Sequence, residues 1–232
     1  MTMSHSTVIV LGMHRSGTSA LTGTLEKAGL QLGSVIEEAS DNLKGSRESR
    51  AIMLLHDDIL QRNGGSWDSP TSNPEWSPVH RAFRDTIIET HKNHSLWGFK
   101  DPRTVLMVGP WCSALPSATL VGIFRHPFAV AQSLFNRSAM PYEKALELWS
   151  HYNRHLLWHR NNLDPMPFLE FSDDGTQFTD QVKNLVHELG LSIDGLEFFD
   201  NSLKQSSYPN LEHIEHARTA LQLYDKLQEA IH

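Results

Sequence analysis

The stretch that decides the fold is Val8-Ile-Val-Leu-Gly-Met-His-Arg-Ser-Gly-Thr-Ser-Ala-Leu-Thr-Gly-Thr-Leu-Glu-Lys27. A short β-branched run leads into a loop of small residues, and apolar residues then follow at helical spacing, at Leu21, Leu25 and Ala28. The pattern predicts a strand, a tight turn and a helix. In such a unit the amides of the loop and of the first helical turn point at one place and, with the helix dipole, form an anion site. Phosphate is the natural ligand of such a site.

The loop departs from the usual ATP-binding pattern G-x-x-x-x-G-K-[ST]. Gly12 and Gly17 are kept, but Thr18 stands where the lysine should be. In nucleoside triphosphate enzymes this lysine and a magnesium ion neutralise the phosphates, and a strand-end aspartate helps to hold the metal. The later strand that could supply the aspartate, 119–124, leads into Arg125 instead. We therefore predict an anion that is bound without magnesium.

Two motifs resemble those of the sulfotransferases that use 3′-phosphoadenosine-5′-phosphosulfate (PAPS). Arg15-Ser-Gly-Thr-Ser19 is similar to their phosphosulfate loop, and Arg125-His-Pro127 followed by Ser133 is similar to their 3′-phosphate motif. The interval from Arg125 to Ser133 is eight residues, as in the family. The resemblance implies transfer of a sulfuryl group from PAPS, as co-substrate, to a hydroxyl or amine, with no metal. The cofactor-binding residues that it implies are His14, Arg15, Ser16, Gly17, Thr18, Ser19, Arg125, Ser133 and, in a C-terminal segment that folds over the nucleotide in the family, Lys204.

A second charged motif follows the predicted strand 96–100. The run Lys100-Asp-Pro-Arg103 resembles a motif that lies beside the sulfuryl group in many of these enzymes. Because ligands of open parallel sheets bind at the carboxyl ends of the strands, we expect Lys100 to lie near Arg15. Both cations would then face the bridging oxygen as its negative charge grows. Asp101 and Arg103 are expected to fix this loop.

The candidate general base is Glu48. Gly45-Ser-Arg-Glu48 resembles the G-aromatic-aromatic-E of bacterial relatives, although the aromatic residues are missing. A carboxylate here could take the proton of the acceptor, but a glutamate at the start of a helix is also favoured by the helix dipole alone. Asp101 and His56 are alternative bases. For His56 and its neighbour Asp57, a solvated helix face is the simpler expectation.

The segment 64–78 predicts a loop that contains Trp67 and Trp76. Tryptophan rings could stack on a glycan or an aromatic acceptor, or they could cap the core. The acceptor is not identified by the sequence, and neither is the oligomeric state.

The predicted fold is a single α/β domain over 1–232, of the P-loop type, with three layers: a central, mostly parallel sheet of four or five strands flanked by helices. We expect strands at 8–11, 96–100, 119–124 and 167–172. We expect helices at 48–61, 79–94, 128–139, 142–162, 179–189 and 211–232, with Phe83, Ile87 and Ile88 of the second facing inward.

Composition excludes some classes of function. The formal net charge is −7 and the pI is near 6.0, whereas proteins that bind nucleic acids or membrane surfaces generally carry a basic excess. The sequence shows no signal or anchor segment, so we expect a cytoplasmic protein. Two other functions remain open: a P-loop kinase-like ATP phosphotransferase, and a non-catalytic protein that binds PAPS.

Overall fold

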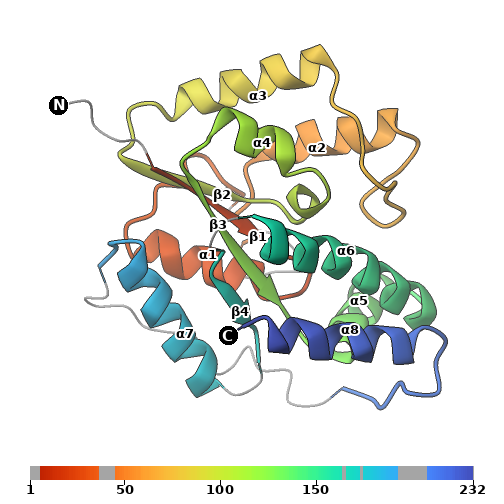
Figure 1. Cartoon of the computed structure of the whole chain (residues 1–232). Coiled ribbons are helices and arrows are strands. Elements are labelled where there is room, and N and C mark those ends of the chain that lie inside the picture. The colour runs from red at the N-terminus through yellow and green to blue at the C-terminus, as the bar shows by residue number, and fades with distance from the viewer. Residues whose placement is uncertain (1–5, 37–44, 164–165, 173–174, 193–207, 232) are drawn as a thin grey trace.

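A computed structural model describes residues 6–36, 45–163, 166–172, 175–192 and 208–231. Its centre is a parallel sheet with the strand order β2-β1-β3-β4 (Figure 1). The strands are β1 (Ser6–Leu11), β2 (Leu96–Lys100), β3 (Ala118–Phe124) and β4 (Phe168–Glu170). The predicted parallel sheet is thus confirmed, with four strands among the described residues.

The register brings the ends of the strands to one edge. Val10 lies opposite Lys100, Leu11 lies opposite Gly122, and Phe124 lies opposite Glu170. The segments that leave these strands therefore meet at the same edge, as expected for a parallel sheet.

Helices cover both faces of the sheet (Figure 1). They are α1 (Thr18–Lys27), α2 (Arg50–Arg62), α3 (Pro78–Thr90), α4 (Gly109–Ala114), α5 (Pro127–Ser138), α6 (Tyr142–Asn162), α7 (Gly175–Glu188) and α8 (Ala217–Glu229), with a 3₁₀ turn, η1 (Pro102–Leu106), after β2. Residues of β1 alternate between two cores because successive side chains of a strand point to opposite faces. Val8 and Val10 pack with α1 and α7, whereas Ile9 and Leu11 pack with the core that contains α2, α5, α6 and α8.

Two expectations about the helices are wrong in detail. Phe83 is 44% exposed instead of facing inward, because the buried stripe of α3 consists of His80, Arg84 and Ile87. Arg84 donates a hydrogen bond to the carbonyl of Pro110 on α4 at 2.6 Å. This bond holds the face of α3 that carries Arg84 against α4. The last helix begins at Ala217, six residues later than position 211. None of the described helices combines the length and the apolar character that a membrane crossing requires.

Candidate active site

The loop between β1 and α1 has a backbone that requires small residues. A Cβ at Gly12 would lie 2.5 Å from the carbonyl oxygen of Ile123, and a Cβ at Gly17 would lie 2.3 Å from the ring of Phe171. Gly17 also has φ +84°, which favours glycine. The first intrahelical bond of α1 runs from the amide of Leu21 to the carbonyl of Gly17, so the amides before it point out of the N-terminus of the helix. Amides at the N-terminus of a helix favour bound anions, so this loop stays a candidate anion site.

Two buried polar atoms of this loop fit an anionic ligand. Ser16 Oγ and His14 Nε2 are buried, and neither has a hydrogen-bond partner among the described residues. A buried polar group without a partner is costly, and a phosphate or an ordered water at the loop would satisfy it. Burial of the His14 ring holds its pKa well below the usual range, and the charge of Arg103 adds to this shift. The imidazole is therefore neutral near pH 7 and can accept or donate one hydrogen bond.

Lys100 reaches the loop from the neighbouring strand. Its side chain is 1% exposed, and its Nζ lies 3.1 Å from Ser19 Oγ and 2.7 Å from Glu48 Oε1. Ser19 in turn donates to the carbonyl of Ser46 at 3.0 Å. The end of β2 thus supplies a cation to a loop that has Thr18 in place of its usual lysine.

Glu48 lies just before α2, where Ser49 is the N-cap, and its carboxylate is largely buried. Burial raises the pKa of Glu48, and Lys100 opposes this shift. Burial lowers the pKa of Lys100, and Glu48 opposes that shift. The separation of 2.7 Å is typical of a charge-assisted hydrogen bond, so we describe the two groups as an ion pair. A carboxylate with a raised pKa is a stronger base than an exposed one.

Asp101 and His56 belong to a buried structural network. Trp111 Nε1 donates to His56 Nε2 at 3.0 Å, so the ring proton lies on Nδ1, which is 3.3 Å from Asp101 Oδ1. Asp101 also accepts from the amide and the guanidinium of Arg103, each at 2.9 Å. Burial alone would raise the pKa of Asp101, but the charge of Arg103 and the hydrogen bond from His56 hold it well below its usual range.

This network agrees with the expectation that Asp101 and Arg103 fix the loop after β2. The expectation of a solvated helix face is wrong for His56, whose side chain is fully buried against Trp111 and Asp101. Asp57 stays on the surface and pairs with Arg103 at 2.6 Å. His56 and Asp101 are both fully buried, and both side chains are bonded to protein groups.

The second motif lies at the exit of β3. Arg125 is 7% exposed, and its guanidinium lies 5.2 Å from the centroid of the Phe171 ring. Ser133, on α5, is 6% exposed and accepts a hydrogen bond from Arg15 Nε at 2.8 Å. The loop and the second motif therefore meet directly through side chains.

The sequence did not predict Phe171 as part of this site, and it left the role of Trp67 open. Phe171, which follows β4, packs on Gly17 and Arg125, and only the end of a short predicted strand could have indicated it. Trp67 lies with its ring centroid 4.7 Å from that of His14, and its carbonyl accepts from the Tyr152 hydroxyl at 2.8 Å. The position of Lys204 lies outside the described residues.

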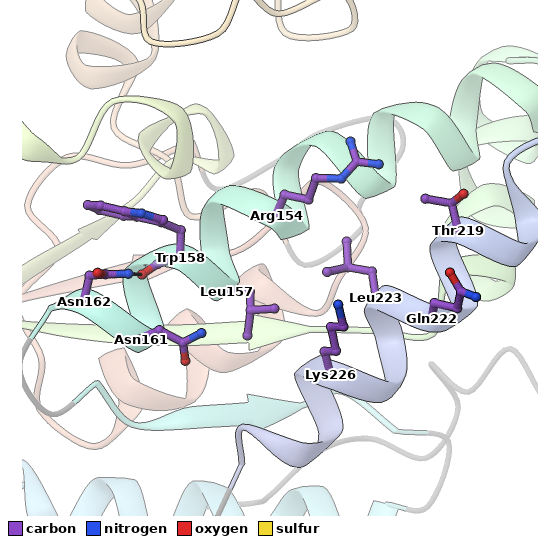
Figure 2. A pocket seen from close by; sticks show the side chains of 9 residues that line it. All are labelled: Arg154, Leu157, Trp158, Asn161, Asn162, Thr219, Gln222, Leu223 and Lys226. Carbon is purple, nitrogen blue, oxygen red and sulfur yellow. Dashed lines mark hydrogen bonds between the residues drawn. The ribbon is translucent and has the colours of Figure 1, made fainter.

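Trp76, by contrast, is 8% exposed and belongs to the core. A groove of about 410 Å³ lies elsewhere, between α6 and α8 (Figure 2). Leu157 and Leu223 line it together with the exposed Trp158. None of its lining residues belongs to the loop or to the motifs described above, so the groove is separate from this site.

Comparison with known proteins finds similarity to sulfotransferases. The model of the sulfotransferase family matches residues 7–195. The sulfotransferase domain of the Synechococcus PCC 7002 olefin synthase is similar in structure, with a TM-score of 0.55 and 17% identity over 98% of this chain and 95% of that one.

More distant similarities are found to the sulfotransferase STF1 of Mycobacterium tuberculosis H37Rv (TM-score 0.49, 14% identity, 97% and 77% of the two chains) and to a retinol dehydratase (TM-score 0.40, 16% identity, 95% and 64%). No curated protein sequence matches the chain. Since the family model covers more than half of the sequence, the chain belongs to the sulfotransferase family.

Proposed function

We propose that this protein is a PAPS-dependent sulfotransferase that acts on a hydroxyl or an amine of a glycan or a small molecule. The observation that carries the proposal is the position of Lys100, a buried cation held between Ser19 of the phosphate loop and the carboxylate of Glu48. A cation and a carboxylate thus adjoin the candidate anion site.

The nucleotide would be held by two groups of residues. The amides at the start of α1, with Ser16, would bind the 5′-phosphate, and Ser16 Oγ is a buried atom that still lacks a partner among the described residues. Arg125 and Ser133 would bind the 3′-phosphate, where a guanidinium suits the phosphate oxygens. PAPS, when bound, supplies a sulfuryl group activated by its anhydride bond to phosphate.

Lys100 would contribute electrostatic stabilisation. Its ammonium is held by protein groups before any substrate arrives, so little reorganisation is needed when negative charge develops at the leaving oxygen. One such preorganised donor typically contributes about 2.7–4 kcal/mol to catalysis. This role matches that of the loop lysine that Thr18 replaces.

Glu48 would act as the general base. The acceptor must lose its proton as its oxygen or nitrogen bonds to sulfur, and the carboxylate would take that proton. Glu48 is suited to this because burial raises its pKa while its pairing with Lys100 keeps it ionised. General base catalysis of this kind typically contributes about 10²–10⁴-fold in rate.

The test is a screen of sugar, phenol, peptide and lipid alcohols with radiolabelled PAPS. We expect label on at least one acceptor class and its loss in Glu48→Gln. Glu89→Gln is the matched control, because Glu89 also pairs with a lysine but lies exposed on α3. Nucleotide binding without transfer to any acceptor would favour the non-catalytic alternative instead.

A further inference from the structure

The groove between α6 and α8 has an apolar floor and an exposed, polar rim (Figure 2). Its floor consists of Leu157 and Leu223, which are the least exposed of its lining residues, and the other lining residues are all exposed. Along α6 the lining runs from Arg154 to Asn162, which is about 12 Å at the helical rise of about 1.5 Å per residue. The groove is thus long enough for about two turns of another helix.

Trp158 adds a large aromatic ring to this groove. Its side chain is 58% exposed, and its ring meets that of His159 edge-on at a centroid distance of 5.5 Å. A single exposed apolar residue needs no explanation, but an exposed apolar patch that is rimmed by polar residues is typical of an interaction site. Tryptophan and arginine are also the residue types that carry most of the binding energy in protein interfaces. Here both occur on one turn of α6, as Arg154 and Trp158.

The charge of the groove is opposite to that of the whole chain. Arg154 from α6 and Lys226 from α8 line it, and none of its nine described lining residues is acidic. Neither cationic side chain has an ion pair or a hydrogen bond within the part of the chain that the structure describes. The chain as a whole carries a formal net charge of −7. The groove is therefore complementary to a partner that presents carboxylates, and such complementarity selects partners and speeds their encounter.

Other occupants fit the groove less well. A second copy of this chain, docked with two-fold symmetry, would set the same cations against each other. An anionic bilayer would gain only about fivefold in affinity from each cation, and the net negative charge of the chain opposes it. Small-molecule sites bury about 70–90% of the ligand, which a groove lined mostly by exposed residues does not do.

We propose that this groove docks an acidic amphipathic helix of a partner protein. Apolar residues at i, i+3 or i+4, and i+7 of that helix would contact Leu157, Leu223 and the ring of Trp158, which is the usual mode of a helix in a groove. Carboxylates beside them would face Arg154 and Lys226. The surface is separate from Lys100 and Glu48, so the proposal does not depend on the function proposed above.

The probe is a phage-displayed library of random peptides of about 16 residues, roughly four helical turns. Selection on the full chain, with subtraction on Trp158→Ala, should enrich peptides that carry net negative charge and apolar residues at helical spacing. The enriched peptide, synthesised with a fluorophore, should bind Trp158→Ala at least about 30-fold more weakly in fluorescence anisotropy, the effect of one interface hot spot. Arg154→Glu or Lys226→Glu should weaken binding by at least about threefold, and more at low salt.

The matched controls lie on α3, where Phe83→Ala removes an exposed ring and Arg81→Glu reverses an exposed charge. Both should bind the peptide within about twofold of the unmodified protein. The proposal would be overturned by a library without enrichment, by enriched peptides that are neutral or basic, or by equal losses in the controls. A dimer in sedimentation, or binding to phosphatidylserine vesicles, that is lost in Trp158→Ala would assign the groove to one of the other occupants and would also overturn it. Turnover with radiolabelled PAPS tests the proposed function separately.

Discussion

Replacing Lys100 by methionine should separate its structural role from its catalytic role. The substitution keeps the aliphatic stem but leaves the carboxylate of Glu48, whose side chain is 12% exposed, without its cation. Breaking a fully buried ion pair in this way costs about 3–5 kcal/mol. Since Glu48 retains some contact with water and can take up a proton, we expect about 2–4 kcal/mol of lost unfolding free energy at pH 7. Turnover should fall by about 10²–10³-fold, because one preorganised donor is removed.

The double variant Lys100→Met, Glu48→Gln distinguishes the two effects. Without the unpaired charge it should regain more than half of the lost stability, yet turnover should stay low because both the cation and the base are missing. Urea unfolding gives the stabilities, and initial rates with radiolabelled PAPS give the turnover. Lys144→Met is the control, because Lys144 forms a more exposed pair with Asp68 and should cost less than about 1 kcal/mol. Turnover of Lys100→Met within about threefold of the unmodified protein would refute the assigned role.

Three further predictions follow from the same contacts. Arg125→Ala should weaken binding of adenosine 3′,5′-bisphosphate by about 1.5–3 kcal/mol in calorimetry, with ADP almost unaffected; equal weakening would make Arg125 structural. Burial raises the pKa of Glu48, and Glu48 must be deprotonated to act as a base. We therefore expect kcat to fall as the pH is lowered, with a midpoint above the ordinary glutamate pKa of about 4.3. A midpoint below that value would argue against Glu48 as the base. Asp101→Asn should cost about 3–5 kcal/mol at pH 7 in urea unfolding. The pKa of Asp101 is lower in the folded protein than its unfolded value of about 3.9, so its contribution to stability is present above about pH 3.9 and is lost as the pH falls below it. The difference in unfolding free energy between Asp101→Asn and the unmodified protein should therefore shrink in acid. A difference that does not change with pH would contradict the proposed network.

The local parts of the fold could be predicted from the sequence. The strand, loop and helix of 8–27 are contiguous, and the helix Tyr142–Asn162 has the predicted bounds, because periodicity and turn residues act over short distances. The convergence of Lys100 with the loop also followed from a general rule, since parallel strands end at one edge of the sheet. Its pairing with Glu48 did not follow from that rule.

Contacts between distant segments could not be predicted. Nothing in the sequence around Arg15 indicates that its side chain donates a hydrogen bond to Ser133. The direction of that side chain depends on the left-handed backbone of Arg15, which the sequence pattern does not reveal. His56 occurs in an amphipathic helix beside two aspartates, and only the tertiary structure shows that its ring is buried against Trp111 and Asp101. The burial of polar residues depends on partners from other elements, which helical periodicity does not contain.

We propose above all that this site binds a nucleotide with a 3′-phosphate and needs no magnesium. The most direct measurement is calorimetric binding of adenosine 3′,5′-bisphosphate and of ADP to the unmodified protein, in EDTA and again with magnesium. We predict at least about tenfold tighter binding of the bisphosphate, with the same affinity in both buffers. Equal affinity for the two nucleotides, or binding of ADP that depends on magnesium, would contradict the account.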